Sequence, residues 1–183
     1  MASLSDLKNQ LTSKGDKRDS GIEKVQKELL LESISRLSAK YGKRGVRFDM
    51  DGWNTRKNGN KWFLDRDGSL KQKEKGKYNP LYSSKTFDAT AVLTVKNKTF
   101  RLYFILKGVE NEGGHQTNVG QELGLTSRLI QKFKGNNSFF FFVLDGSEMD
   151  RIMDYFDECE KYFITNSNTI EEAIESLINK NLE

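Results

Sequence analysis

Asp88 and Lys107 are the two residues of this chain whose types and positions most clearly suggest chemistry. Each stands at the end of a predicted strand, and a tight turn at Asn97 and Lys98 would make the two strands antiparallel neighbours. In that register position i faces position 195 − i, so Asp88 lies directly opposite Lys107. A carboxylate could bind a divalent cation, and an ammonium could stabilise charge that develops on a phosphate. The pair therefore predicts metal-assisted phosphodiester cleavage.

The apolar pattern of the two strands supports this pairing. On one face of the predicted hairpin every pair is apolar, with residues 89, 91, 93 and 95 opposite residues 106, 104, 102 and 100. The other face carries Asp88 and Lys107. A shift of one residue would distribute the apolar side chains over both faces, so the pattern fixes which side chains share a surface.

The stretches "FDA" (87–89) and "ILK" (105–107) resemble the motif of the PD-(D/E)XK nuclease superfamily, which includes most type II restriction endonucleases. In that superfamily an aspartate begins the second core strand, and an acidic-x-Lys triplet ends the third. The resemblance covers roughly residues 21–145, mainly by the order of the elements. It implies an α/β (α+β) fold with a restriction-endonuclease-like αβββαβ core, in which helices flank a mixed central sheet. It also implies Mg²⁺ as cofactor, replaceable by Mn²⁺, and double-stranded DNA as substrate.

Two positions depart from that motif. Ile105 occupies the acidic position of the triplet, and Phe87 replaces the proline that precedes the aspartate. Some restriction endonucleases compensate for a non-acidic residue in the triplet with a glutamate from the following helix. Glu122 stands 15 residues beyond Lys107, less than two turns into a helix that would begin at residue 116.

The resemblance thus implies a set of four site residues: Asp88 and Glu122 as metal ligands, Lys107 as a catalytic residue, and Glu23 on the first helix as an auxiliary carboxylate. Glu110 and Glu112 are closer to Lys107 in sequence and remain alternatives to Glu122. Each of these residues also has an ordinary interpretation, since strand-end lysines and helix-surface glutamates are common on solvated surfaces.

The charges of the chain are unevenly distributed. Residues 40–85 contain 13 Lys and Arg against 5 Asp and Glu, whereas residues 148–183 contain 3 against 10. The basic part predicts a region that contacts nucleic-acid phosphates, although a solvated loop would have the same composition. The predicted nucleic-acid-binding residues are Arg56, Lys57, Lys61, Lys71, Lys73, Lys75, Lys77 and, as a possible substrate contact, His115.

Hydrophobic periodicity predicts the elements that must position these residues. A helix is expected over 21–41, with Ser20 as its cap and Gly42 at its end, followed by strand-like stretches at 45–53 and 61–68. Beyond the hairpin, the pattern predicts a helix over 116–134, a strand buried on both sides over 138–146, a helix over 147–162, a short strand over 162–166, and a closing helix that starts at Thr169.

Length and composition bound the class of protein. The 183 residues predict one domain, with 1–20 flexible and 54–80 as a basic loop region. Cys159 and His115 are the only residues of their types, which excludes an internal disulfide and an ordinary structural zinc site. No stretch is typical of a membrane span or a signal peptide, so we expect a protein of the microbial cytoplasm.

The leading hypothesis is a Mg²⁺-dependent, sequence-specific DNA endonuclease that acts as a homodimer or higher homo-oligomer. A repair or recombination nuclease would use the same fold. The alternative from another class is a nucleic-acid-binding protein that has lost catalytic activity because Ile105 replaces the acidic residue of the triplet. Ile105 is also compatible with a relocated carboxylate or with an introduced change that traps a substrate complex.

Overall fold

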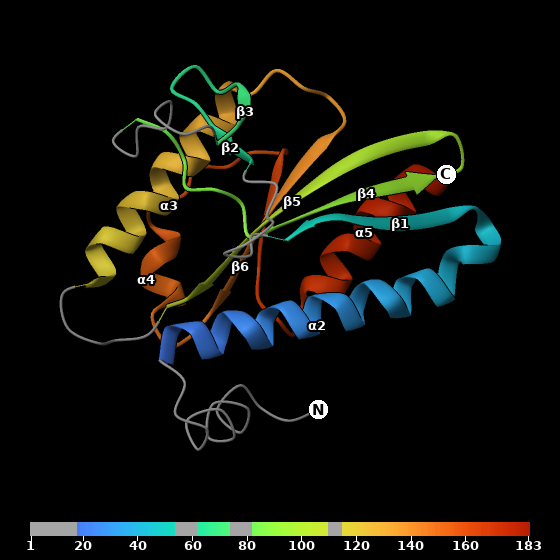
Figure 1. Ribbon diagram of the computed structural model, residues 1–183, viewed down its shortest axis with the longest axis horizontal. Coiled ribbons are helices and arrows are strands. Elements are labelled where there is room, and N and C mark those ends of the chain that lie inside the picture. Colours follow the sequence, from blue (N-terminus) through green and yellow to red (C-terminus); the bar gives the residue numbers. More distant parts are fainter. Residues whose placement is uncertain (1–17, 54–61, 74–81, 110–114) are drawn as a thin grey trace.

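Alternating and continuous apolar stretches build a central sheet that is covered by helices on both faces (Figure 1). The computed structural model describes residues 18–53, 62–73, 82–109 and 115–183. The helices are α2 (Arg18–Tyr41), the 3₁₀ turn η1 (Gly42–Arg44), α3 (His115–Lys132), α4 (Met149–Met153) and α5 (Ile170–Leu182). The strands are β1 (Val46–Trp53), β2 (Trp62–Leu64), β3 (Leu70–Gln72), β4 (Ala89–Val95), β5 (Lys98–Gly108), β6 (Ser138–Asp145) and β7 (Tyr162–Thr165).

The central sheet is mixed, as predicted. Its five strands lie in the order β1-β4-β5-β6-β7, with β1, β4 and β5 antiparallel and β5, β6 and β7 parallel. The parallel connections run through α3 and α4, because a parallel neighbour can be reached only by a crossover. The α/β (α+β) fold class and the order of the elements are therefore confirmed. None of the helices within the described residues combines the length and hydrophobicity that a membrane crossing requires.

The predicted register of the β4–β5 hairpin is wrong by two residues. Val95 pairs with Lys98 and Ala89 pairs with Phe104, so the turn consists of Lys96 and Asn97 and facing positions sum to 193. Lys96 adopts a left-handed φ of 54°, which a two-residue hairpin turn favours. Because side chains alternate with a period of two, this shift leaves every side chain on its predicted face. It does move Lys107 two residues beyond the position opposite Asp88.

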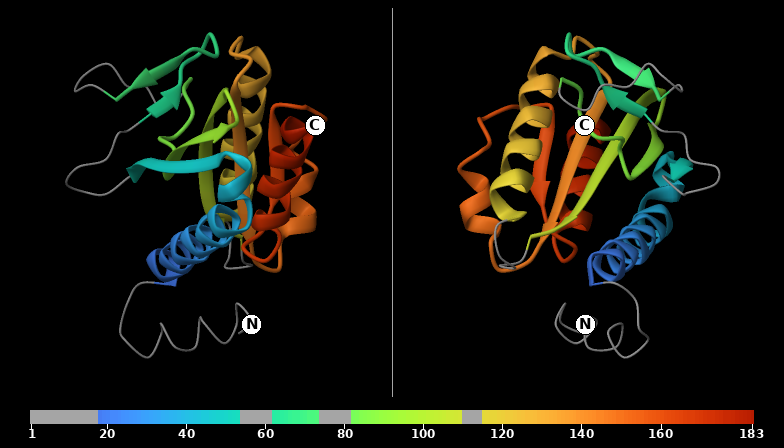
Figure 2. Two further views of the ribbon diagram at one scale, coloured as in Figure 1. Left: turned by 90° about the vertical axis from the view of Figure 1, so that its right-hand side faces the viewer. Right: turned by 60° about the vertical axis from the view of Figure 1, so that its left-hand side comes forward.

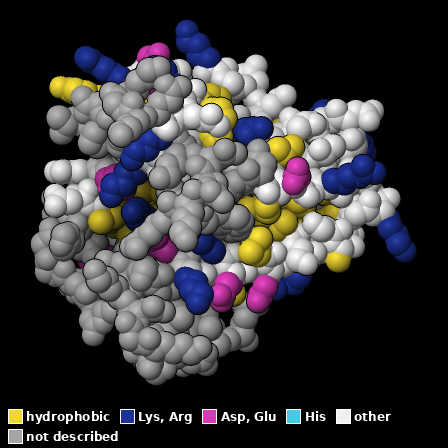
Figure 3. All heavy atoms as spheres, in the orientation of Figure 1, with side chains coloured by type: hydrophobic (Ala, Val, Ile, Leu, Met, Phe, Trp, Pro, Cys, Tyr) yellow, Lys and Arg dark blue, Asp and Glu magenta, His cyan; other side chains and the backbone are white. Residues whose placement is uncertain are grey.

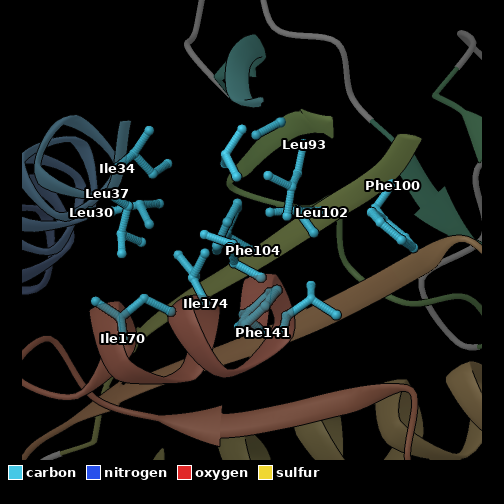
Figure 4. Close-up of a cluster of buried hydrophobic side chains, with 14 of the residues drawn as sticks. Leu30, Ile34, Leu37, Leu93, Phe100, Leu102, Phe104, Phe141, Ile170 and Ile174 are labelled. Carbon is cyan, nitrogen blue, oxygen red and sulfur yellow. The ribbon is translucent and has the colours of Figure 1, made fainter. Parts of the chain in front are cut away.

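Two apolar layers enclose the sheet. On one face α2 and α5 pack on β4, β5 and β6 through buried side chains such as Leu37, Phe104 and Ile174, which point toward one another in Figure 4. On the other face α3 and α4 cover a second cluster. The phenylalanine run of β6 serves both layers, since Phe141 belongs to the first cluster and Phe142 to the second. The prediction of a strand buried on both sides is confirmed.

Two helix predictions need correction. α2 begins at Arg18, so Ser20 lies inside the helix and does not cap it. The helix predicted over 147–162 is limited to α4, because the chain leaves helical geometry after Met153 to place the Phe156 ring 4.8 Å from that of Phe142 in the second cluster. Two other predicted boundaries agree with the structure: the first helix ends before Gly42, and α5 starts after Thr169.

The short β2–β3 hairpin lies beside the C-terminal end of α3 (Figures 1 and 2). Gly68 makes this approach possible, because a Cβ atom there would stand 2.7 Å from Cβ of Lys132 and its φ is +79°. Residues 82–88 then lead from this hairpin to β4 along the edge of β2, through backbone hydrogen bonds from Ser84 to Leu64 and from Phe87 to Trp62. The hairpin is thus joined directly to the segment that carries Asp88.

Candidate active site

Asp88 is fixed to the end of β5 by its backbone and by its side chain. Its N–H donates to the carbonyl of Phe104 at 2.8 Å, and its Oδ2 accepts from the Leu106 N–H at 2.8 Å. The carboxylate therefore replaces a backbone carbonyl in the antiparallel ladder, immediately before β4 begins. This anchoring orients the side chain without help from a flexible loop.

The environment of Asp88 makes it unusually basic for an aspartate. Burial is the largest cause and raises the pKa of Asp88 from 3.8 to about 6. The hydrogen bond from Leu106 opposes this rise, the charge of Glu23 adds to it, and the ammonium groups of Lys107 and Lys27 lower the pKa. Four charged or polar partners from α2 and β5 therefore surround this carboxyl group.

Glu122 and Lys107 form an ion pair next to this carboxylate. Nζ of Lys107 lies 3.8 Å from Oε1 of Glu122, and each side chain is 21% exposed. α3 begins at His115, so Glu122 lies about two turns into the helix and reaches back to the end of β5. Helix α3 thus brings a carboxylate to the strand end, as the sequence predicted.

Helix α2 brings Glu23 and Lys27 to the same place because its first half is tied to the ends of β5 and β6. Nε2 of Gln26 lies 3.1 Å from the carbonyl of Lys107 and 2.6 Å from Oδ2 of Asp145. Ile22 packs where Gly108 has no side chain, since a Cβ at Gly108 would lie 2.9 Å from its Cδ1. Sequence reasoning missed Gln26, whose role depends on strands that are far away along the chain.

Ile105 points into the apolar cluster beneath α3 rather than toward solvent. It is 8% exposed and pairs with Phe142 across the β5–β6 ladder. A carboxylate at this position would stand among phenylalanine and leucine side chains, where an unpaired charge is costly. The ion pair of Lys107 with Glu122 forms two residues further along β5.

All four predicted site residues lie at the end of β5: Asp88, Lys107, Glu122 and Glu23. Two lysines that sequence reasoning missed join them. Lys85 pairs with Glu122 at 2.5 Å, and Lys27 lies near enough to Asp88 to lower its pKa. The only sequence signal for Lys27 was its position one helical turn after Glu23.

The predicted nucleic-acid-binding residues are described only in part. Lys71 and Lys73 are exposed at β3 and just after it, and Lys71 pairs with Asp65. His115 begins α3, and its side chain lies outside the described part. The remaining predicted residues and the two alternative carboxylates also lie outside it: Arg56, Lys57, Lys61, Lys75, Lys77, Glu110 and Glu112.

On the face that Figure 3 shows, the described Lys and Arg side chains are interspersed with described Asp and Glu side chains. At the end of β5 the lysines 27, 85 and 107 balance the carboxylates 23, 88 and 122 when all are ionised. Among the described residues, no three His, Cys, Asp or Glu side chains lie close enough together to hold a metal ion by themselves.

No known protein family matches this chain, and comparisons with curated proteins and with solved structures found no significant similarity.

Proposed function

We propose that the protein is a Mg²⁺-dependent DNA endonuclease of the restriction type, with its active site at the end of β5. The observation that carries this proposal is the approach of Lys107, on β5, to two carboxylates: Asp88, just before β4, and Glu122, on α3. Two carboxylates and an ammonium at the end of one central strand have the composition that phosphodiester cleavage requires. The order α2, β1, β4, β5, α3 and β6 gives further support, because it follows the αβββαβ order expected for this class.

The donor set fits a hard divalent cation. Mg²⁺ is usually held by one or two carboxylates, with water and substrate phosphate completing its shell, so a third protein carboxylate is not required. Asp88 and Glu122 would provide those ligands, with Glu23 close by as an auxiliary carboxylate. When bound, the cation would neutralise phosphate charge and lower the pKa of an attacking water.

The residues of the chain have separate roles in this proposal. Asp88 is held in place by Leu106, so its carboxylate needs no rearrangement to bind a cation. Lys107 is mostly buried beside Glu122, and its ammonium would stabilise negative charge on the phosphate in the transition state. The exposed Lys71 of β3, Lys73 just after it, and the neighbouring basic stretches of the sequence would contact the DNA backbone. A homodimer would place two such sites on the two strands of a duplex.

A binding-only protein is the second candidate, and Ile105 is the observation that favours it. This residue is buried in the apolar cluster, so the triplet position cannot contribute a carboxylate to the site. The two candidates differ in one requirement. Cleavage depends on Glu122, whereas binding through phosphate contacts does not.

Glu122→Gln tests this requirement. The substitution keeps the size of the side chain and removes its charge, so we expect cleavage of supercoiled plasmid in Mg²⁺ to slow by on the order of a hundredfold or more. Glu172→Gln is a matched control, because Glu172 is exposed on α5, which covers the opposite face of the sheet from α3. The control should cleave like the unaltered protein.

Gel electrophoresis of the products separates the possible outcomes. Discrete bands that require Mg²⁺ would support a sequence-specific endonuclease, and a smear would indicate a non-specific nuclease. Intact plasmid with retarded mobility would favour the binding-only protein. Normal cleavage by Glu122→Gln would show that the second metal ligand is a different residue.

A further inference from the structure

Lys85 forms an ion pair with Glu122, the carboxylate that the proposed function assigns to a metal ion. Its Nζ lies 2.5 Å from Oε2 of Glu122, while Nζ of Lys107 lies 3.8 Å from Oε1. The two oxygens of Glu122 are therefore engaged by two different ammonium groups. The two lysines differ in accessibility, since the side chain of Lys85 is 62% exposed and that of Lys107 is 21% exposed.

The backbone around Lys85 is fixed although its side chain extends into solvent. The residue before it, Ser84, donates its N–H to the carbonyl of Leu64 at 2.8 Å, and the Ser84 hydroxyl accepts from the Leu64 N–H at 2.8 Å. Two residues later, Phe87 donates to the carbonyl of Trp62 at 2.8 Å. Because hydrogen bonds to β2 hold the backbone on both sides of Lys85, the long side chain of Lys85 can move while its Cα stays in place.

We propose that Lys85 is a second lysine of the active site, which occupies Oε2 of Glu122 in the metal-free protein and contacts a DNA phosphate once a cation takes that oxygen. This inference rests on the proposed function and adds to it. It assigns Lys85 two successive partners of the same charge sign: a carboxylate of the protein and a phosphate of the substrate.

Electrostatics favours this exchange. A divalent cation that approaches Glu122 repels an ammonium group 2.5 Å from the same carboxylate. A pair with so exposed a lysine is weak, so the cation can displace it. The released ammonium remains at the site, where it is a compact point charge that suits a phosphate oxygen. Lys107 cannot exchange as easily, because it is mostly buried.

The inference predicts opposite effects of one substitution on two ligands. Lys85→Gln removes the cation that competes for Glu122, so the DNA-free protein should bind Mn²⁺ about fivefold more tightly. The same change removes a phosphate contact, so binding of a mixed-sequence DNA duplex in Ca²⁺ should weaken. The slope of log K against log salt concentration, which is negative, should become less steep by about 0.9. A residue with a purely structural role would not improve metal affinity.

Calorimetric titration with Mn²⁺ and fluorescence anisotropy with the labelled duplex measure the two effects. Lys98→Gln is the matched control, since Lys98 is exposed at the opposite end of β5 and should change neither affinity. Unchanged or weaker Mn²⁺ binding by Lys85→Gln would overturn the inference and leave the proposed function intact, and so would an unchanged salt slope. Absence of Mn²⁺ binding by the unaltered protein would overturn both.

Discussion

Replacing Lys107 with alanine is expected to slow DNA cleavage by about a hundredfold to a thousandfold, because the substitution removes a preorganised group that stabilises transition-state charge. The ammonium of Lys107 lies 3.8 Å from Glu122 and close enough to Asp88 to lower the pKa of that carboxyl group, so the substitution removes a positive charge that faces both proposed metal ligands. Binding of DNA should change little, because the proposal assigns most phosphate contacts to exposed lysines.

Single-turnover cleavage with enzyme in excess separates the chemical step from binding. Lys98→Ala controls for the loss of one lysine, and thermal unfolding of Lys107→Ala verifies that the variant is folded. The backbone carbonyl of Lys107, which accepts from Gln26, is retained in the variant. A rate within tenfold of the unaltered protein would mean that Lys107 takes no part in charge stabilisation.

Replacing Asp88 with asparagine is expected to stabilise the metal-free protein at neutral pH while removing a metal ligand. The folded protein holds the pKa of Asp88 at about 6, above its usual value of 3.8. Ionisation of Asp88 therefore lowers the free energy of unfolding, by up to about 3 kcal/mol, because the pKa values of the folded and unfolded chain differ by about 2.2. Asparagine keeps an oxygen that can accept from the Leu106 N–H, so the anchoring hydrogen bond is retained.

The pH dependence follows from the direction of the shift. Well below pH 3.8 the carboxyl group is protonated in both the folded and the unfolded chain, so the variant and the unaltered protein should be equally stable. Between about pH 4 and pH 6 the unfolded chain loses its proton first, which reduces the stability of the unaltered protein. Above pH 6 the advantage of Asp88→Asn should be constant, at about 1–3 kcal/mol.

Urea unfolding in EDTA at pH 4.5 and pH 8 measures this difference. Asp49→Asn is the control, because Asp49 is exposed on β1 and its replacement should change stability little at either pH. An Asp88→Asn variant that is less stable than the unaltered protein at pH 8 would show that the carboxylate is stabilised in the folded state. The combination of higher stability and lost cleavage would be typical of an active-site residue.

The sequence predicts the face of each β4 and β5 side chain but not the register of the two strands. A shift of two residues preserves the apolar pattern, so no periodicity argument separates a turn at 96–97 from one at 97–98. Contacts that are distant in sequence decide between them. The Lys96 N–H donates to the carbonyl of Gly45, and the Lys96 ammonium contacts the carbonyl of Leu182.

The sequence predicted those site residues to which the resemblance assigns a role. It did not predict residues that reach the site only through contacts made by the folded chain. The resemblance named Asp88, Lys107 and Glu122, and Lys107 lies near both carboxylates, although it stands two residues beyond the position that faces Asp88. Lys85 carries no such signal, since its pairing with Glu122 depends on the way β2 holds residues 82–88. The early end of α4 has a similar cause, because packing of Phe156 on β6 overrides the helical pattern.

The central claim is that Glu122 completes a cation site with Asp88 in place of a carboxylate at position 105. Calorimetric titration of Mn²⁺ into the unaltered protein, Asp88→Asn and Glu122→Gln tests it most directly. We predict saturable Mn²⁺ binding by the unaltered protein and a loss of affinity of tenfold or more, corresponding to about 1.4 kcal/mol, in each variant. Equal Mn²⁺ affinity in all three proteins would contradict the claim.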